Sequence, residues 1–78
     1  MVITPAQCRA ARGLMAWSQD DLAANANVGN STVRDFEKGR RVPLTENLIA
    51  IRNALEAAGV EFLAARIGKG VGVRLVGK

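Results

Sequence analysis

The feature that most constrains the fold is a break between two short polar helical stretches in residues 18–39, SQDDLAANANVGNSTVRDFEKG. The break falls at Asn27, and asparagine is the non-glycine residue that best tolerates a left-handed backbone. We therefore predict a helix capped by Ser18, a turn at Asn27 in which Val28 points inward, and a second helix over about residues 30–38. Helices this short are unstable alone in water, so both must pack against other elements.

A further helix is predicted before this pair. Thr4 and Gln7 have the spacing of a capping box, and Pro5 takes the first helical position, where its missing N–H costs nothing. The helix should end near Met15. Its apolar face consists of Cys8, Ala11 and Met15. In the helix that Ser18 caps, Leu22, Ala23 and Ala26 face inward, and the two alanines allow another helix to come close.

A fourth helix is predicted between residues 45 and 59, with Thr45 as its cap and Gly59 as its end. Its apolar stripe consists of Leu48, Ile51, Ala54, Leu55 and Ala58. The helical period then gives way to alternation, first at Val60 and Phe62 and later at Val71, Val73 and Leu75. These are predicted strands of a hairpin that turns through Gly68, Lys69 and Gly70.

The predicted fold is therefore mainly α, with a four-helix domain over residues 1–59 and a C-terminal β-hairpin over residues 60–78. Because a two-stranded hairpin is marginal in water, it must pack on the helices, on a second copy of the chain, or on both.

Composition excludes several classes of function. Histidine is absent and Cys8 is the only cysteine, which excludes intramolecular disulfides, histidine-based acid–base chemistry and the usual transition-metal sites. We expect no metal and no cofactor, and Cys8 is interpreted as a small core residue. No apolar run approaches the roughly 18 residues that cross a bilayer, and the N-terminus does not resemble a signal peptide. We expect a cytoplasmic protein without a membrane partner.

The charge is unevenly distributed. The net charge is +4, yet residues 1–61 carry seven basic and seven acidic side chains. The excess lies in residues 62–78, which contain no acidic residue and four basic ones: Arg66, Lys69, Arg74 and Lys78. A second basic cluster is formed by Lys38, Arg40 and Arg41. Such clusters suggest a polyanionic partner, although solvated surface charge gives the same pattern.

The helix over residues 30–38 has two distinct faces. At about 100° per residue, Val33, Phe36 and Glu37 fall on the inner side. The outer side carries the polar residues Asn30, Ser31, Thr32, Arg34 and Asp35. A helix in the DNA major groove requires such a row of donors and acceptors, with apolar residues such as Val33 and Phe36 holding its inner side. An ordinary solvated helix shows the same pattern.

The whole segment of residues 18–39 resembles the helix-turn-helix of the lambda-repressor-like, XRE-type transcriptional regulators. The signature positions are Gln19, Leu22, Ala23, Val28, Ser31, Thr32, Val33, Glu37 and Gly39. The framework from Thr4 to Gly59 also fits, whereas the hairpin lies outside the resemblance. Two departures are Asn27, where the family usually has glycine, and Gly29, where it often has a capping serine or threonine.

The resemblance implies roles for individual residues. Gln19 is expected to bind a backbone phosphate at the start of its helix. The expected base-reading face comprises Asn30, Ser31, Thr32, Arg34 and Asp35, and the expected phosphate contacts of the following loop are Lys38, Arg40 and Arg41. Arg12 matches a position that forms an ion pair with the glutamate at Glu37, which would make Glu37 part of the scaffold.

The expected partner is double-stranded DNA, bound by a homodimer, because helix-turn-helix proteins mostly read two half-sites. Val71, Val73 and Leu75 are the expected dimerisation residues, and the basic hairpin residues leave open a contact with phosphate. The leading interpretation is a repressor. An antitoxin-type protein that also binds a partner protein, with the basic hairpin as the expected surface for it, is the alternative. The composition disfavours an enzyme, and the glycine-rich residues 68–72 lack the strand–turn–helix context of a phosphate-binding loop.

Overall fold

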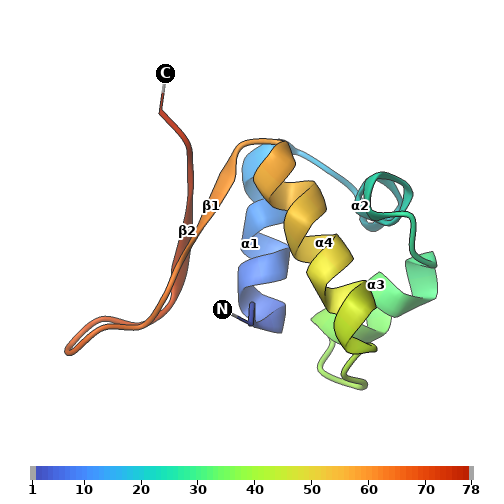
Figure 1. Cartoon of the computed structure of the whole chain (residues 1–78), viewed down its shortest axis with the longest axis horizontal. Coiled ribbons are helices and arrows are strands. Elements are labelled where there is room, and N and C mark those ends of the chain that lie inside the picture. The colour runs from blue at the N-terminus through green and yellow to red at the C-terminus, as the bar shows by residue number, and fades with distance from the viewer. Residues whose placement is uncertain (1, 78) are drawn as a thin grey trace.

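The computed structural model describes residues 2–77, and in it four helices precede a two-stranded hairpin (Figure 1). The elements are α1 (Pro5–Met15), α2 (Gln19–Ala26), α3 (Asn30–Glu37), α4 (Thr45–Ala57), β1 (Val60–Leu63) and β2 (Gly72–Leu75). The helices pack on one another, and the hairpin lies beside α1 on the side away from α2 and α3. The predicted class, mainly α with a C-terminal hairpin, is confirmed.

Local capping explains where the first two helices begin. The Thr4 hydroxyl accepts from the Gln7 N–H, and the Gln7 side chain accepts from the Thr4 N–H, so the predicted capping box is formed. Ser18 and Asp21 form a second capping box at the start of α2. Asn27 adopts the predicted left-handed conformation, with φ of 56°, and this ends α2.

The helices enclose a small apolar core. Its fully buried members include Leu22 of α2, Val33 of α3, and Ile51 and Leu55 of α4. Cys8 and Ala11 of α1 are also completely buried. Cysteine and alanine side chains are short, so α1 lies close to the other helices and little volume remains to fill.

The start of α4 differs from the prediction. Thr45 is the first residue of the helix, and Leu44 holds the cap position without a side-chain hydrogen bond to the helix. The prediction of Thr45 as the cap was therefore wrong by one residue. Threonine is preferred at a cap and leucine is not, so the sequence favoured a start one residue too late.

The hairpin is antiparallel and shares the helical core. Val60 pairs with Leu75 and Phe62 pairs with Val73. Val60 and Phe62 are buried in the same core as the helices, and Val73 packs against it. The inner face of the hairpin is thus packed against the helical domain.

The hairpin turn is displaced from its predicted position. Arg66 and Lys69 pair through two backbone hydrogen bonds of 2.8 and 2.9 Å, so the turn is Ile67–Gly68 rather than Gly68 to Gly70. Gly68 has φ of 75°, which glycine adopts without strain. Val71 consequently lies outside β2, contrary to the predicted strand.

A buried glutamine joins the hairpin to α1. The side-chain amide of Gln7 donates to the carbonyl oxygens of Leu63, at 3.2 Å, and Gly72, at 3.0 Å. These two residues are the last pair of the β1–β2 ladder. Gln7 is 1% exposed, and its oxygen is already bound to the Thr4 N–H. One side chain therefore caps α1 and holds the end of the sheet.

Within residues 2–77, no helix is both long and apolar enough to cross a membrane. Over the same range, no three histidine, cysteine, aspartate or glutamate side chains gather where they could hold a metal ion.

Candidate nucleic-acid interface

The α3 helix has the two faces that its sequence predicts. Val33 is fully buried, Phe36 is 4% exposed and Glu37 is 3% exposed. Among the outward residues, Asn30, Ser31 and Arg34 are exposed, whereas Thr32 and Asp35 are half-buried. Two apolar anchors thus fix the helix from behind and leave a polar surface on its other side.

The orientation of α3 is held by a cluster around the Glu37 carboxylate. Both oxygens of Glu37 accept from the Arg12 guanidinium at 2.6 Å, which is the ion pair expected from the sequence. The Gln19 amide donates to Oε1 at 3.1 Å, and the Cys8 thiol donates to Oε2 at 3.2 Å. The cluster therefore connects α1, α2 and α3 at one point.

The environment of this cluster determines its ionisation. Burial raises the pKa of the Glu37 carboxyl, but hydrogen bonds from Arg12, Gln19 and Cys8 outweigh burial and hold its pKa below the ordinary value. Burial, together with the hydrogen bond to Glu37, raises the pKa of the Cys8 thiol far above its ordinary range. Cys8 therefore stays protonated and acts as a hydrogen-bond donor in the core rather than as a nucleophile.

Gln19, the expected phosphate contact, is partly engaged in this cluster. Its amide nitrogen carries two hydrogens, and the bond to Glu37 uses one of them. Gln19 is half-buried at the first position of α2, where backbone N–H groups also point outward. One amide hydrogen thus remains for an anion at the end of the helix.

Three of the expected base-reading residues have partners within the chain. The Asn30 amide donates to Asp20 at 3.1 Å, which connects the starts of α2 and α3. Arg34 and Asp35 form a partly exposed ion pair with 3.7 Å between nitrogen and oxygen. Both interactions are at the surface, where water competes with them, so a base edge can replace either partner at small cost.

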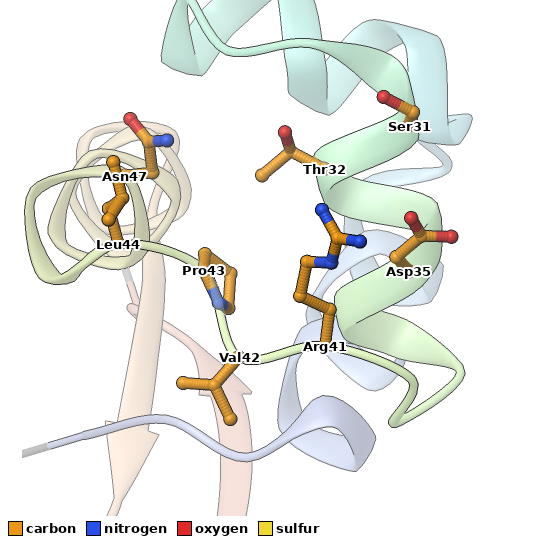
Figure 2. A pocket seen from close by; sticks show the side chains of 8 residues that line it. All are labelled: Ser31, Thr32, Asp35, Arg41, Val42, Pro43, Leu44 and Asn47. Carbon is orange, nitrogen blue, oxygen red and sulfur yellow. The ribbon is translucent and has the colours of Figure 1, made fainter.

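A hollow beside α3 gathers further polar side chains (Figure 2). It is lined by Ser31, Thr32, Asp35, Arg41, Val42, Pro43, Leu44 and Asn47. Figure 2 shows the Arg41 guanidinium next to Asp35 and beneath Thr32, with Pro43 across the hollow. The structure thus brings one of the three predicted loop cations beside α3, while Lys38 and Arg40 are exposed at its end.

Residues 9–63 match the protein family described as Helix-turn-helix, and the match covers 55 of the 78 residues. The chain belongs to this family. It is the lambda-repressor-like, XRE-type helix-turn-helix that the sequence resembles. No curated protein matches the chain.

As a member of this helix-turn-helix family, the chain is a DNA-binding transcriptional regulator, and the family is generally non-enzymatic. In the structure α2 and α3 are the two helices of the motif, and Asn27 lies in the turn between them. The outer face of α3 and the hollow beside it therefore form the candidate surface for DNA.

Two residues that shape this surface or its support were not predicted from the sequence. Asn47 lines the hollow from the first turn of α4, and the polar run of residues 45–47 is the only local signal for it. Gln7 was assigned only to a helix cap, because its contacts with Leu63 and Gly72 span 56 and 65 residues of chain.

Proposed function

We propose that this helix-turn-helix regulator is a repressor that binds an inverted-repeat operator as a homodimer, with α3 in the major groove. The observation that carries the proposal is the outward row of polar side chains on α3, held from behind by Val33 and Phe36. The likeness to lambda-repressor-like regulators supports repression as the outcome. A DNA partner agrees with the cytoplasmic location expected from the sequence.

In this proposal the residues of α3 read individual bases. Arg34 can donate two hydrogen bonds to guanine, Asn30 can pair with adenine, and Asp35 can accept from the amino group of cytosine. Asp35 also repels phosphate, so it restricts the accepted sequence rather than adding affinity. Ser31 and Thr32 complete the reading face.

The backbone contacts come from the two ends of this surface. Gln19 binds phosphate at the start of α2, and Lys38, Arg40 and Arg41 bind it from the loop after α3. The position of Arg41 beside α3 supports its inclusion. Because each cation displaces a condensed counterion, these residues supply most of the salt-dependent affinity.

Selection of binding sites from a random DNA pool tests the proposal. At roughly physiological salt, non-specific contacts are weakened and a specific regulator enriches its operator. We expect an inverted repeat whose half-sites lie about one DNA turn apart. Recovery of no preferred sequence by the full chain contradicts sequence-specific binding.

Asn30→Ala is expected to relax selectivity at one base position of the selected operator. The loss of one paired amide should reduce discrimination there by about 1–3 kcal/mol and leave the other positions unchanged. Asn25→Ala is the matched control, because Asn25 is an exposed asparagine of α2 with one hydrogen bond, to the Asp21 carbonyl. Affinities for operators altered at single positions provide the measurement. Equal effects of the two variants contradict base reading by Asn30.

The proposed homodimer uses the hairpin, although its three expected residues are not equivalent. Val73 is packed against the helical core, whereas Val71 and Leu75 remain exposed. Any hairpin-mediated contact with a second copy must therefore centre on Val71 and Leu75 and on the open edge of the two-stranded sheet.

Leu75→Asp is expected to convert the dimer to a monomer at micromolar concentration, since a charge would be placed in an apolar contact. Ile49→Asp on α4 is the matched control, because Ile49 is 51% exposed and Leu75 is 49% exposed. Sedimentation velocity with and without operator DNA measures the outcome. A monomeric unaltered chain under both conditions contradicts the dimer, and a monomer produced only by Ile49→Asp moves the interface to α4.

A protein partner is the second candidate function, as in antitoxins that bind both DNA and another protein. The supporting observation is a set of exposed apolar side chains near the N-terminus and α4, namely Val2, Val42, Leu44 and Ile49. Hollows lined by several of these residues lie on the same surface. Purification of an untagged chain together with a second small protein would favour this function.

A further inference from the structure

The segment between the two strands forms an ordered arm. The β1–β2 ladder ends at the pair Leu63 and Gly72, and residues 64–71, called the arm here, continue beyond it. All eight arm residues are exposed. The two backbone hydrogen bonds between Arg66 and Lys69 close its tip. Figure 1 shows the arm projecting away from the helices, so the arm is an ordered extension of the hairpin and not part of the core.

The tip of the arm combines one apolar side chain with two cations. Ile67, at its apex, is fully exposed, and a cation stands on each side of the turn, Arg66 and Lys69. Among residues 2–77, neither cation has an ion-pair partner, whereas Arg74 at the base of the hairpin pairs with Glu61 at 2.7 Å. Because residues 62–78 contain no acidic residue, the arm presents positive charge to any partner.

The base of the arm is held in a fixed direction. The buried Gln7 side chain binds the Leu63 and Gly72 carbonyl oxygens at the point where the arm leaves the sheet. In Figure 1 the tip of the arm and the loop between α3 and α4 both reach the lower side of the molecule. The longest dimension of the chain is 34 Å, which is about one turn of B-DNA. A duplex that contacts α3 and lies along this lower side would reach the tip within about one helical turn.

We propose that the arm is a second DNA-contacting element of this chain, outside the segment that α3 reads. Arg66 and Lys69 bind the two phosphate rows that border the minor groove, and the apolar Ile67 enters the groove between them. Apolar side chains flanked by basic ones are used in this way by proteins that wedge into the minor groove. The proposal rests on the DNA-binding function proposed above and adds a place of contact that the helix-turn-helix does not supply.

Salt dependence of operator binding tests the arm directly. For Arg66→Gln combined with Lys69→Gln, we expect the slope of log K against log salt to become shallower by about 3.6 for the bound homodimer, because its two protomers together lose four phosphate contacts and each contributes about 0.9. The base preference at α3 should not change. The charge-preserving pair Arg66→Lys and Lys69→Arg should keep the slope of the unaltered chain. Arg52→Gln, which removes one charge from α4, should change the slope by much less than the loss of one phosphate contact would.

Phosphate-ethylation interference locates the contact. The unaltered chain should show interfering phosphates outside the half-site bound by α3, and the double glutamine variant should lose only these. Ile67→Ala should weaken binding severalfold with an unchanged salt slope, because it removes an apolar contact and no charge. Thermal unfolding should be the same for all the arm variants, since every altered arm side chain is exposed.

The results separate this inference from the function on which it rests. If the unaltered chain binds its operator but the double glutamine variant keeps the same slope and interference pattern, the arm does not touch DNA and the inference is wrong. A change in sedimentation without a change in slope would assign the arm to a protein contact and would also overturn it. If the unaltered chain binds no DNA, the proposed function fails and the inference fails with it.

Discussion

Glu37→Ala is expected to remove a large part of the chain's free energy of unfolding at 25 °C. The carboxylate is buried and pairs with Arg12 through both oxygens, so its removal leaves a guanidinium without its counter-charge inside the domain. Breaking a buried pair in this way costs about 3–5 kcal/mol. A domain of this length has roughly 4–12 kcal/mol of total stability, so the loss is a large part of it.

Urea denaturation followed by circular dichroism measures this effect, and two variants calibrate it. Glu61→Gln removes an exposed carboxylate that also pairs with an arginine, Arg74, and it should shift the midpoint only slightly. Combining Glu37→Leu with Arg12→Met should recover much of the loss, because no uncompensated charge then remains. If Glu37→Ala is no more harmful than Glu61→Gln, the cluster does not hold the three helices together.

The same carboxylate makes the stability depend on pH with a defined sign. The pKa of Glu37 is lower in the folded chain than in the unfolded chain, so its stabilising effect is complete above the unfolded value, about 4.3. The effect is lost as the pH falls through the lower folded value. Unfolding midpoints measured between pH 7 and pH 2 should therefore decline below about pH 4.5.

Gln7→Leu is expected to destabilise the chain by about 2–4 kcal/mol and to release the hairpin first. Leucine fills a similar volume but leaves the Thr4 N–H and the Leu63 and Gly72 carbonyl oxygens without their partner. Each unsatisfied buried group costs about 1–3 kcal/mol, and water can reach part of this site. Because the hairpin is marginal without its support, amide exchange should accelerate most at β1 and β2.

Thr4→Ala is the matched control for this prediction. It removes the hydroxyl that accepts from the Gln7 N–H but leaves all three hydrogen bonds of the Gln7 side chain possible. The loss of this cap should cost about 1 kcal/mol and should not affect exchange in the strands. Equal strand protection in Gln7→Leu and Thr4→Ala would mean that Gln7 does not hold the hairpin.

The sequence by itself was sufficient at the starts of α1 and α2, where the deciding interaction spans a few residues. The capping boxes at Thr4 and Ser18 join residues three apart, so their spacing is visible in the chain. Asn27 ends α2 because of its own backbone preference. The inward face of α3 follows from helical periodicity alone, and the family pattern then connects Arg12 with Glu37. These features predicted α1, α2 and α3 and the candidate DNA face.

Only the tertiary structure decided the contacts between distant segments. Gln7 holds a hairpin 56 to 65 residues away, and Glu37 gathers donors from α1 and α2 as well as its predicted arginine. The turn at Ile67–Gly68 is set by pairing between strands, which local glycine content does not specify. Val73 was expected to face a second copy, but packing turned it toward the helices. Long-range packing decides between local conformations of similar energy. A single sequence does not show which of these conformations the packing favours.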